Sequence, residues 1–311
     1  MSTQNPKKLK MSRGTIKDML ETCGFAIIRN VLTPEEIIEA TDLMIGWEKG
    51  IPGLSEIHSD LHPHGIYKFH GVGHAPHAWY IRTRPKVQQV FKDLWDTDDL
   101  ISSFDGSCYM PKSLAKKDTK KGWTHVDQSP KASGNLMCYQ GLVSLTDNKE
   151  RTLVVYEGSN NLYNQYCVDR ELKGTKHWEK IDPAYLESIA DSRRVLTIPA
   201  GSIALWDSRT FHQNQYGVTS DTDDNNTVWS EERRVQYVCF LPRNHKDHTE
   251  KVHEKRLKAF HAKRTTSHWP CPQYLNGLQP NTWGDETKKI DYEKLPDHNL
   301  DYLMSDIIKI I

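Results

Sequence analysis

The chain of 311 residues has no long apolar run and no excess of charge of either sign. Lys plus Arg and Asp plus Glu number 41 each, so the formal net charge is zero. This balance argues against nucleic acid or an anionic membrane surface as a partner. The mean hydropathy is −0.70, and no apolar run approaches the roughly 18 residues of a membrane span. We therefore expect no nucleic-acid partner and no membrane insertion.

Paired cysteines are also missing. The six cysteines are scattered and form no Cys-x-x-Cys motif, and several lie in apolar runs, where a buried free thiol is the usual state. This pattern favours a reducing, cytoplasmic location. Residues 1–13 are polar and basic with no apolar segment behind them, unlike a secretory signal. We predict a disordered tail over 1–13 and a single domain over 14–311.

The N-terminal part of the chain has helical patterns around one short strand. Apolar spacing predicts helices over 15–22 and 85–95, with a strand at 25–28 between them. Thr33, Pro34 and Glu36 form a strong helix start, since Thr caps, Pro suits the first turn and Glu completes a capping box. This helix is expected to end near Gly46.

From residue 100 the pattern changes to short strands. They are predicted at 101–110, 123–127, 136–145, 153–156, 195–198, 202–206, 211–214 and 233–241. A polar and helical insertion covers about 157–192, and a charged helix at 251–263 begins a C-terminal helical extension. The pattern predicts a mainly β fold with flanking helices (α+β), built as a double-stranded β-helix or cupin-like jelly-roll barrel.

The most informative stretch is His125-Val126-Asp127. Alternate side chains of a strand point to the same face, so His125 and Asp127 can reach one point in space. His212, beside a later apolar run, is the candidate third ligand. Two His and one carboxylate form the facial triad that holds non-haem Fe(II) with open positions.

His-x-Asp alone is a weak signal, because it occurs three times in this chain. His58-Ser59-Asp60 lies in a loop rich in Pro, Gly and His, and His245-Lys246-Asp247 follows the last apolar strand in a polar turn. Only His125 is followed by several strand-like runs and another His. Residues 50–78 carry six His at irregular spacing, and we interpret this segment as a surface loop or part of a substrate mouth.

The order of these elements resembles the phytanoyl-CoA dioxygenase-like branch of Fe(II)/2-oxoglutarate-dependent oxygenases. The resemblance covers most of residues 14–242 and includes Arg233-Arg234 together with the segments at 24–28, 124–127, 140–147, 155–160, 201–207 and 212. Asn160 stands where the family usually has His. The interval from His212 to Arg233 is longer than usual and includes a run of Asp and Asn over 218–227.

The resemblance implies Fe(II), 2-oxoglutarate and O₂ as cofactors, with release of succinate and CO₂. The remote carboxylate of 2-oxoglutarate would then need a guanidinium. Only one of Arg233 and Arg234 can face the barrel interior. We favour Arg233 and keep Arg234 open. Asn214 shares a strand face with His212 and, like Gln140, is a candidate donor to 2-oxoglutarate.

The candidate substrate contacts are His74, Trp79, Arg82 and Lys112. Local cations, including Arg82 and Lys112, suit a small carboxylated or amino-acid-derived substrate, oxidised by hydroxylation, cyclisation or desaturation. Some relatives are kainoid-synthase-like enzymes of secondary metabolism. Two alternatives stay open: a cupin-like metal-binding jelly roll without oxygenase activity, and a protein hydroxylase with an open peptide groove.

Overall fold

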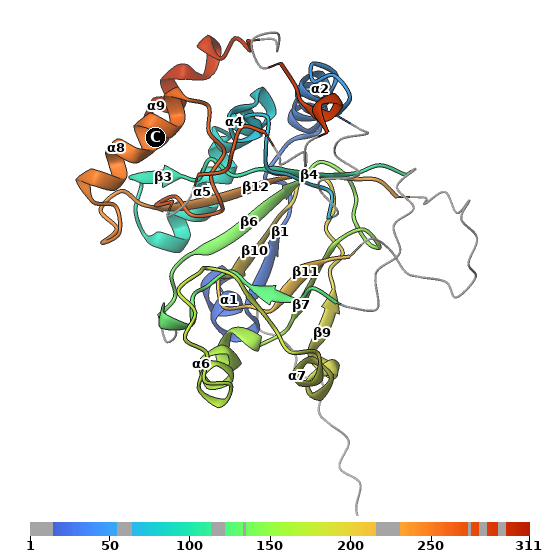
Figure 1. Ribbon diagram of the computed structural model, residues 1–311, viewed down its shortest axis with the longest axis vertical. Helices are drawn as coiled ribbons and strands as arrows, with labels where there is room; N and C mark the ends of the chain where they lie inside the picture. The colour runs from blue at the N-terminus through green and yellow to red at the C-terminus, as the bar shows by residue number, and fades with distance from the viewer. Residues whose placement is uncertain are drawn as a thin grey trace, which may run out of the picture.

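The computed structural model describes residues 15–54, 64–112, 122–132, 135–215, 231–272, 275–279, 285–291 and 297–311. Within these ranges the chain forms two antiparallel sheets with helices outside them (Figure 1). The predicted tail at 1–13 and the Asp/Asn-rich run over 218–227 lie outside the described residues. No helix in the described part of the chain is long and apolar enough to cross a membrane.

The larger sheet has seven strands among the described residues. Its order is β1-β10-β6-β12-β4-β2, and β3 also pairs with β12. Strand β12 is the longest and contacts three other strands of the sheet. The strands are β1 (Phe25–Ile28), β2 (Ile66–Tyr67), β3 (Leu100–Ser102), β4 (Ser107–Met110), β6 (Tyr139–Ser144), β10 (Ile203–Asp207) and β12 (Arg233–Pro242).

The smaller sheet has five strands in the order β8-β5-β11-β7-β9. It is built from β5 (His125–Val126), β7 (Leu153–Tyr156), β8 (Glu179–Lys180), β9 (Arg193–Val195) and β11 (His212–Asn214). An apolar layer joins this sheet to the larger one. It includes Leu142 and Val235 from the larger sheet and Leu153 and Val155 from the smaller sheet. The two sheets therefore pack face to face.

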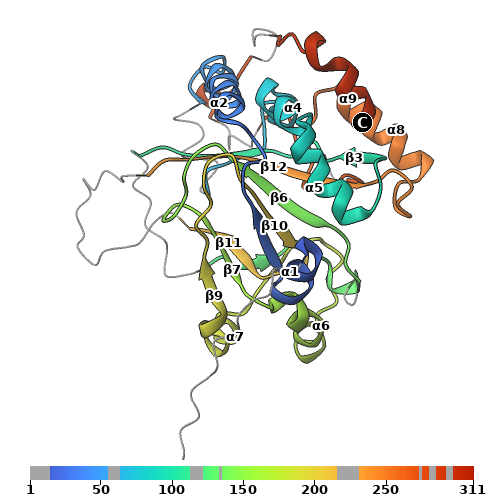
Figure 2. The ribbon, with the colours of Figure 1, turned by 180° about the vertical axis from the view of Figure 1, so that it is seen from behind.

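Helices cover the outer face of the larger sheet (Figure 2). They are α2 (Pro34–Lys49), α4 (Pro76–Arg82) and α5 (Pro85–Trp95). Apolar side chains of α5, such as Phe91, pack with Val238 and Phe240 of β12 in the main core cluster. The opposite end of the molecule carries α1 (Ile16–Cys23), α6 (Ser159–Asp169) and α7 (Pro183–Ser188).

The predicted start of α2 is confirmed. The backbone N–H of Glu36 donates to Thr33 Oγ1 at 3.2 Å, and the Thr33 N–H donates to Glu36 Oε2 at 2.9 Å. This reciprocal cap satisfies two backbone donors that the first helical turn leaves without partners. The helix continues to Lys49, about one turn beyond the predicted end.

The C-terminal extension contains α8 (Glu250–His261) and α9 (Met304–Ile310). The buried Arg256 of α8 donates from Nη1 to the Ser102 carbonyl of β3 at 2.9 Å. Thr266 also contacts the loop that follows β3, since its hydroxyl accepts from the Phe104 N–H at 3.0 Å. The segment that follows α8 is therefore held against the open edge of the larger sheet.

The predicted combination of antiparallel sheets with flanking helices is confirmed. Two local predictions are wrong. The strand expected at 101–110 is two strands, β3 and β4, because the chain turns through Phe104-Asp105-Gly106 between them. The segment interpreted as a surface loop or part of a substrate mouth is, in its described part, not a surface loop: His74 ends a short 3-10 turn, His77 lies in the first turn of α4, and both are buried.

Candidate metal centre

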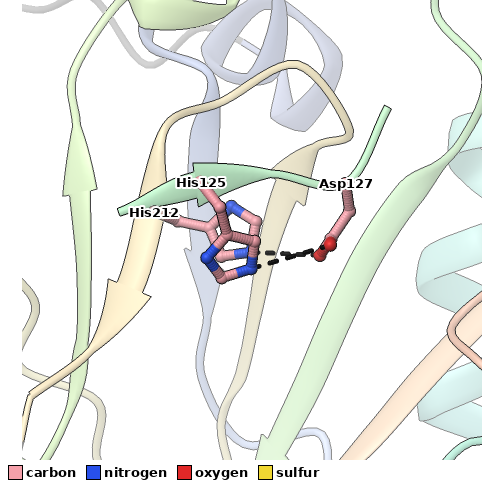
Figure 3. A group of neighbouring side chains, drawn as sticks. All are labelled: His125, Asp127 and His212. Atoms are coloured by element: carbon pink, nitrogen blue, oxygen red, sulfur yellow. Dashed lines mark ion pairs between the residues drawn. The ribbon is translucent and has the colours of Figure 1, made fainter. Parts of the chain in front are cut away.

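Neighbouring strands of the smaller sheet bring the three predicted ligands together. His125 on β5 lies directly opposite His212 on β11 in the antiparallel register. Directly opposed residues point to the same face of a sheet. Asp127 is two residues beyond His125 and faces the same point. Figure 3 shows both imidazoles turned toward the Asp127 carboxylate.

The ligand atoms form a compact cluster. His125 Nε2 lies 3.6 Å from Asp127 Oδ1, and His212 Nε2 lies 3.2 Å from Asp127 Oδ2. One ligand atom from each residue lies within 4.8 Å of the other two. Two imidazole nitrogens and one carboxylate oxygen at this spacing fit a first-row divalent metal such as Fe(II).

Backbone carbonyls orient both imidazoles. His125 Nδ1 donates to the Trp123 carbonyl at 3.0 Å, and His212 Nδ1 donates to the Thr210 carbonyl at 2.9 Å. A proton on Nδ1 leaves the Nε2 lone pair free, and both Nε2 atoms face the cluster. Metal-binding His residues commonly have such a partner on the second nitrogen. The donor set therefore fits a metal without rearrangement.

The charge states of the cluster also suit a cation. Burial alone would raise the pKa of Asp127, but the imidazoles of His268, His125 and His212 hold that pKa well below its usual range. Burial lowers the pKa of His212, and the nearby His125 lowers it further. An ionised carboxylate and a neutral imidazole are the forms that bind metals.

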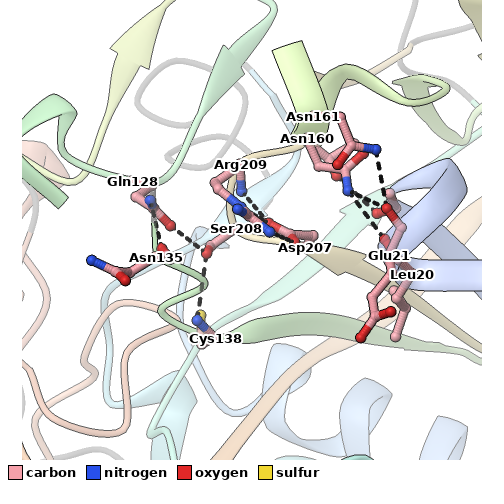
Figure 4. A network of polar contacts seen from close by, with 12 residues as sticks. Leu20, Glu21, Gln128, Asn135, Cys138, Asn160, Asn161, Asp207, Ser208 and Arg209 are labelled. Atoms are coloured by element: carbon pink, nitrogen blue, oxygen red, sulfur yellow. Dashed lines mark hydrogen bonds and ion pairs between the residues drawn. The ribbon is translucent and has the colours of Figure 1, made fainter. Parts of the chain in front are cut away.

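A polar network links the segments that carry the ligands (Figure 4). Ser208 Oγ donates to Gln128 Oε1 at 2.7 Å and accepts from the Cys138 N–H at 3.4 Å. Gln128 directly follows Asp127, and Ser208 lies in the turn that leads to His212. These bonds tie together the two segments that carry the ligands. Elsewhere in the same view, Asn160 Nδ2 donates to the Leu20 carbonyl at 3.2 Å, so it fastens α6 to α1.

The cluster opens into a cavity of about 290 Å³ between the sheets. Gln140 and Asn214, the two candidate donors, line it. Gln140 Nε2 donates to Asp127 Oδ2 at 2.9 Å, so it contacts the ligand carboxylate directly. Asn214 Nδ2 donates to the Tyr237 hydroxyl at 3.1 Å. Both side chains therefore line the cavity next to the three candidate ligands.

The two candidate arginines lie on opposite faces of β12. Arg233 is fully buried on the face that carries Val235 and Tyr237, between the sheets. Its Nε and Nη2 have no hydrogen-bond partner among the described residues, and Nη1 lies 3.8 Å from Cys108 Sγ. Arg234 lies on the other face and forms an ion pair with Glu48 of α2 at 2.8 Å. Only Arg233 is oriented toward the interior.

None of the four candidate substrate contacts lines this cavity. His74 and Trp79 instead line a separate cavity of about 830 Å³ next to α8, where Trp79 is fully buried and His74 Nε2 bonds to the Arg264 carbonyl at 3.0 Å. Arg82 is fully buried and donates to the carbonyls of Gly73 and Asp105. Lys112 is exposed at the end of a described range. The periodicity of the sequence alone does not distinguish a buried position such as Arg82 from one that lines the metal-centre cavity.

Several cavity residues were not predicted. His268 comes from the segment after α8, and its Nδ1 lies 3.9 Å from Asp127 Oδ2. His177 and Trp178 come from the polar insertion, and Asp105 comes from the β3–β4 loop. No local motif marks these positions. His177, Trp178 and His268 reach the cavity because the insertion and the C-terminal extension fold back over the smaller sheet, whereas Asp105 reaches it through the turn between β3 and β4.

The other His-x-Asp motifs do not form a comparable site in the described chain. His245 Nδ1 lies 3.8 Å from Asp247 Oδ2, and both belong to one turn beside β12. The motif at 58–60 lies outside the described residues. Among those residues, only His125, Asp127 and His212 form a group of at least three potential ligands with this spacing.

No family model matches the chain. Among curated proteins, it is 29% identical over 281 residues to "Ava biosynthesis cluster protein O" of Aspergillus versicolor, across 83% of this chain and 86% of that protein. Among solved structures, it is similar to HygX from Streptomyces hygroscopicus, with a TM-score of 0.48 and 10% identity across 75% of this chain and 87% of HygX.

A second similar structure is SnoK from nogalamycin biosynthesis, with a TM-score of 0.46 and 14% identity across 79% of this chain and 91% of SnoK. HygX was solved with nickel and 2-oxoglutarate bound. SnoK is a non-haem α-ketoglutarate-dependent carbocyclase.

Proposed function

We propose that this protein is a non-haem Fe(II)/2-oxoglutarate-dependent oxygenase that oxidises a C–H bond of a small molecule. The observation that carries the proposal is the His125–Asp127–His212 cluster, preoriented at the mouth of a cavity between two sheets. Three protein ligands on one side of a metal leave positions for a co-substrate and O₂. When bound together, Fe(II), 2-oxoglutarate and O₂ would supply the oxidising power for C–H cleavage, with release of succinate and CO₂.

The protein residues have separate tasks in this proposal. His125, Asp127 and His212 hold the metal, and Gln140 orients the Asp127 carboxylate through its hydrogen bond. Arg233 receives the remote carboxylate of 2-oxoglutarate, because it is a buried guanidinium with unpartnered donors on the inner face of β12. Asn214 is a further donor on the strand face of His212. Trp123 and Trp206, which also line the cavity, shield the reacting groups from water.

A buried Arg233 without a carboxylate partner distinguishes this proposal from a metal-binding jelly roll without oxygenase activity. An unpaired buried charge costs several kcal/mol, and a purely structural metal site gives no reason for one. A dicarboxylate co-substrate does. We infer that the two packed sheets form a double-stranded β-helix and that residues 14–311 are one domain.

Free cysteines support the proposed cytoplasmic location. All six are unpaired, and four of them are buried. Unpaired thiols of this kind are typical of proteins in a reducing compartment. The link to secondary metabolism is supported by the name of the A. versicolor relative.

The proposal is tested by succinate formation. The purified protein is incubated with Fe(II), 2-oxoglutarate and O₂ while amino-acid-derived and acyl candidates are screened. We expect succinate release that needs all three components and rises with a substrate. His212→Ala should abolish it, whereas His245→Ala, which alters a surface His-x-Asp pair, should not. Equal release by the His212→Ala variant would overturn the assignment.

A further inference from the structure

Asp105 places a carboxyl group in the cavity of the candidate metal centre. It lies in the β3–β4 loop and lines the cavity together with Gly106. Hydrogen bonds to the backbone carbonyls of Asp105 and Gly106 hold this loop in place. Arg82 Nη2 donates to the Asp105 carbonyl at 2.7 Å, and Gln236 Nε2 donates to the Gly106 carbonyl at 2.8 Å. A Cβ at residue 106 would lie 2.0 Å from the Tyr67 carbonyl oxygen, so only Gly permits this approach.

Few groups of the protein stabilise a negative charge on the Asp105 side chain. Its Oδ1 accepts from the Gly106 N–H at 2.7 Å. Among the described residues, no Lys, Arg or His side chain forms an ion pair with it. The guanidinium of Arg82 is occupied by backbone carbonyls, and Lys68 is exposed. Burial raises the pKa of Asp105 to about 7. A carboxyl group in this position is stabilised by a cation that enters the cavity.

Aromatic side chains face the same space. Trp123, Trp178, Trp206 and Tyr237 all line the cavity with Asp105. The face of an aromatic ring attracts a cation, most strongly for Trp. Trp123 and Trp178 already stack on His125, so Trp206 and Tyr237 are the rings beside which a cation in the cavity can lie. By contrast, Arg82, which suggested a carboxylated substrate, has its guanidinium directed at the backbone carbonyls of Gly73 and Asp105.

We propose that Asp105 binds a protonated nitrogen of the substrate, so that the substrate class is a small organic amine whose oxidisable carbon lies toward the His125–Asp127–His212 cluster. This inference rests on the proposed function for the reaction, but the binding of the amine does not depend on it. Asp105 forms a charge-assisted contact with the ammonium group, and the Trp walls enclose the attached carbon skeleton.

The test compares benzylamine with benzyl alcohol, a neutral ligand of similar size, by calorimetry. Both are titrated into the protein with and without Fe(II) and 2-oxoglutarate under anaerobic conditions. We expect benzylamine to bind at least about tenfold more tightly, which corresponds to about 1.4 kcal/mol. Asp105→Asn should reduce the ratio to below about twofold. Asp42→Asn, which alters an exposed carboxyl of α2, should leave it unchanged.

Equal affinities in the unaltered protein, no measurable benzylamine binding, or a ratio that survives Asp105→Asn would each overturn the inference. The comparison of the two ligands on the unaltered protein decides the question even if the variant does not fold. A failure of the proposed oxygenase function is seen separately, as absence of Fe(II)- and 2-oxoglutarate-dependent succinate, because amine binding is also measured without metal.

Discussion

Arg233 and Arg234 are adjacent in the chain, yet their guanidinium groups lie on opposite sides of the larger sheet. Arg233 is fully buried between the sheets. Arg234 Nη1 donates to both carboxylate oxygens of Glu48 at 2.8 Å, and its Cζ lies 3.6 Å from the centre of the Tyr109 ring. Strand alternation separates the two arginines, so the two substitutions should give different results.

Arg233→Ala should weaken the binding of 2-oxoglutarate. Loss of charge-assisted hydrogen bonds to a carboxylate costs roughly 1.5–3 kcal/mol, or about 10–100-fold in affinity. The measurement is the 2-oxoglutarate concentration that half-saturates succinate formation. Metal affinity should change little, because Arg233 does not contact the three ligands. An unchanged half-saturation would mean that another residue binds the remote carboxylate.

Arg234→Ala should reduce stability instead. The Arg234 and Glu48 side chains are only 7% and 14% exposed, and removal of one partner from a buried pair costs roughly 3–5 kcal/mol. Urea unfolding of the apoprotein measures this loss. If Arg234→Ala raised the 2-oxoglutarate requirement while Arg233→Ala did not, the inner and outer faces of β12 would be assigned the wrong way round.

Gln140→Leu should lower metal affinity without removing a ligand. Gln140 holds Asp127 Oδ2 at 2.9 Å, and loss of a partner that orients a ligand typically costs about 10–100-fold in metal affinity. Competition with a chelator gives the dissociation constant. The matched control is Gln213→Leu. Gln213 is next to His212 in the chain and does not line the cavity. Equal effects of the two variants would remove the orienting role.

Acid should destabilise the fold through buried neutral histidines. Burial lowers the pKa of His74 and of His77 from 6.5 to about 3 in each case. The unfolded chain therefore binds more protons between pH 6.5 and 3, so stability falls as the pH is lowered through this window. Each residue should remove about 2 kcal/mol between pH 7 and pH 5.

Urea unfolding at the two pH values measures this effect. His77→Gln should make the pH dependence shallower by about 2 kcal/mol, even if it lowers stability at both pH values. His261→Gln, at the exposed end of α8, should leave the pH dependence unchanged. A slope unaltered by His77→Gln would show that this residue does not titrate on unfolding.

The sequence predicted the parts of the site that depend on local periodicity. His125 lies on β5 and Asp127 directly follows that strand, two residues further on, so both can reach one point. Alternation lets only one of Arg233 and Arg234 face inward, and the family resemblance favoured Arg233. The capping box at Thr33 likewise depends on neighbouring residues. These relationships depend only on residues that are close together in the sequence.

The cavity wall could not be predicted in the same way. His268 and Trp178 lie beside the cluster because a C-terminal segment and an insertion fold over it, and neither carries a local signal for this position. Arg82 and Trp79 were predicted to contact the substrate, but both are fully buried and neither lines the cavity of the metal centre. Burial of long polar side chains depends on tertiary contacts, as the bonds of Arg82 to two backbone carbonyls show.

The most direct test of the metal centre is the visible charge-transfer absorption that forms when Fe(II) and 2-oxoglutarate bind together without oxygen. The unaltered protein and His245→Ala should both show this band, with one iron per chain. His125→Ala, Asp127→Ala and His212→Ala should each lose it. A band of full intensity in any of these three variants, or no band in the unaltered protein, would contradict the account.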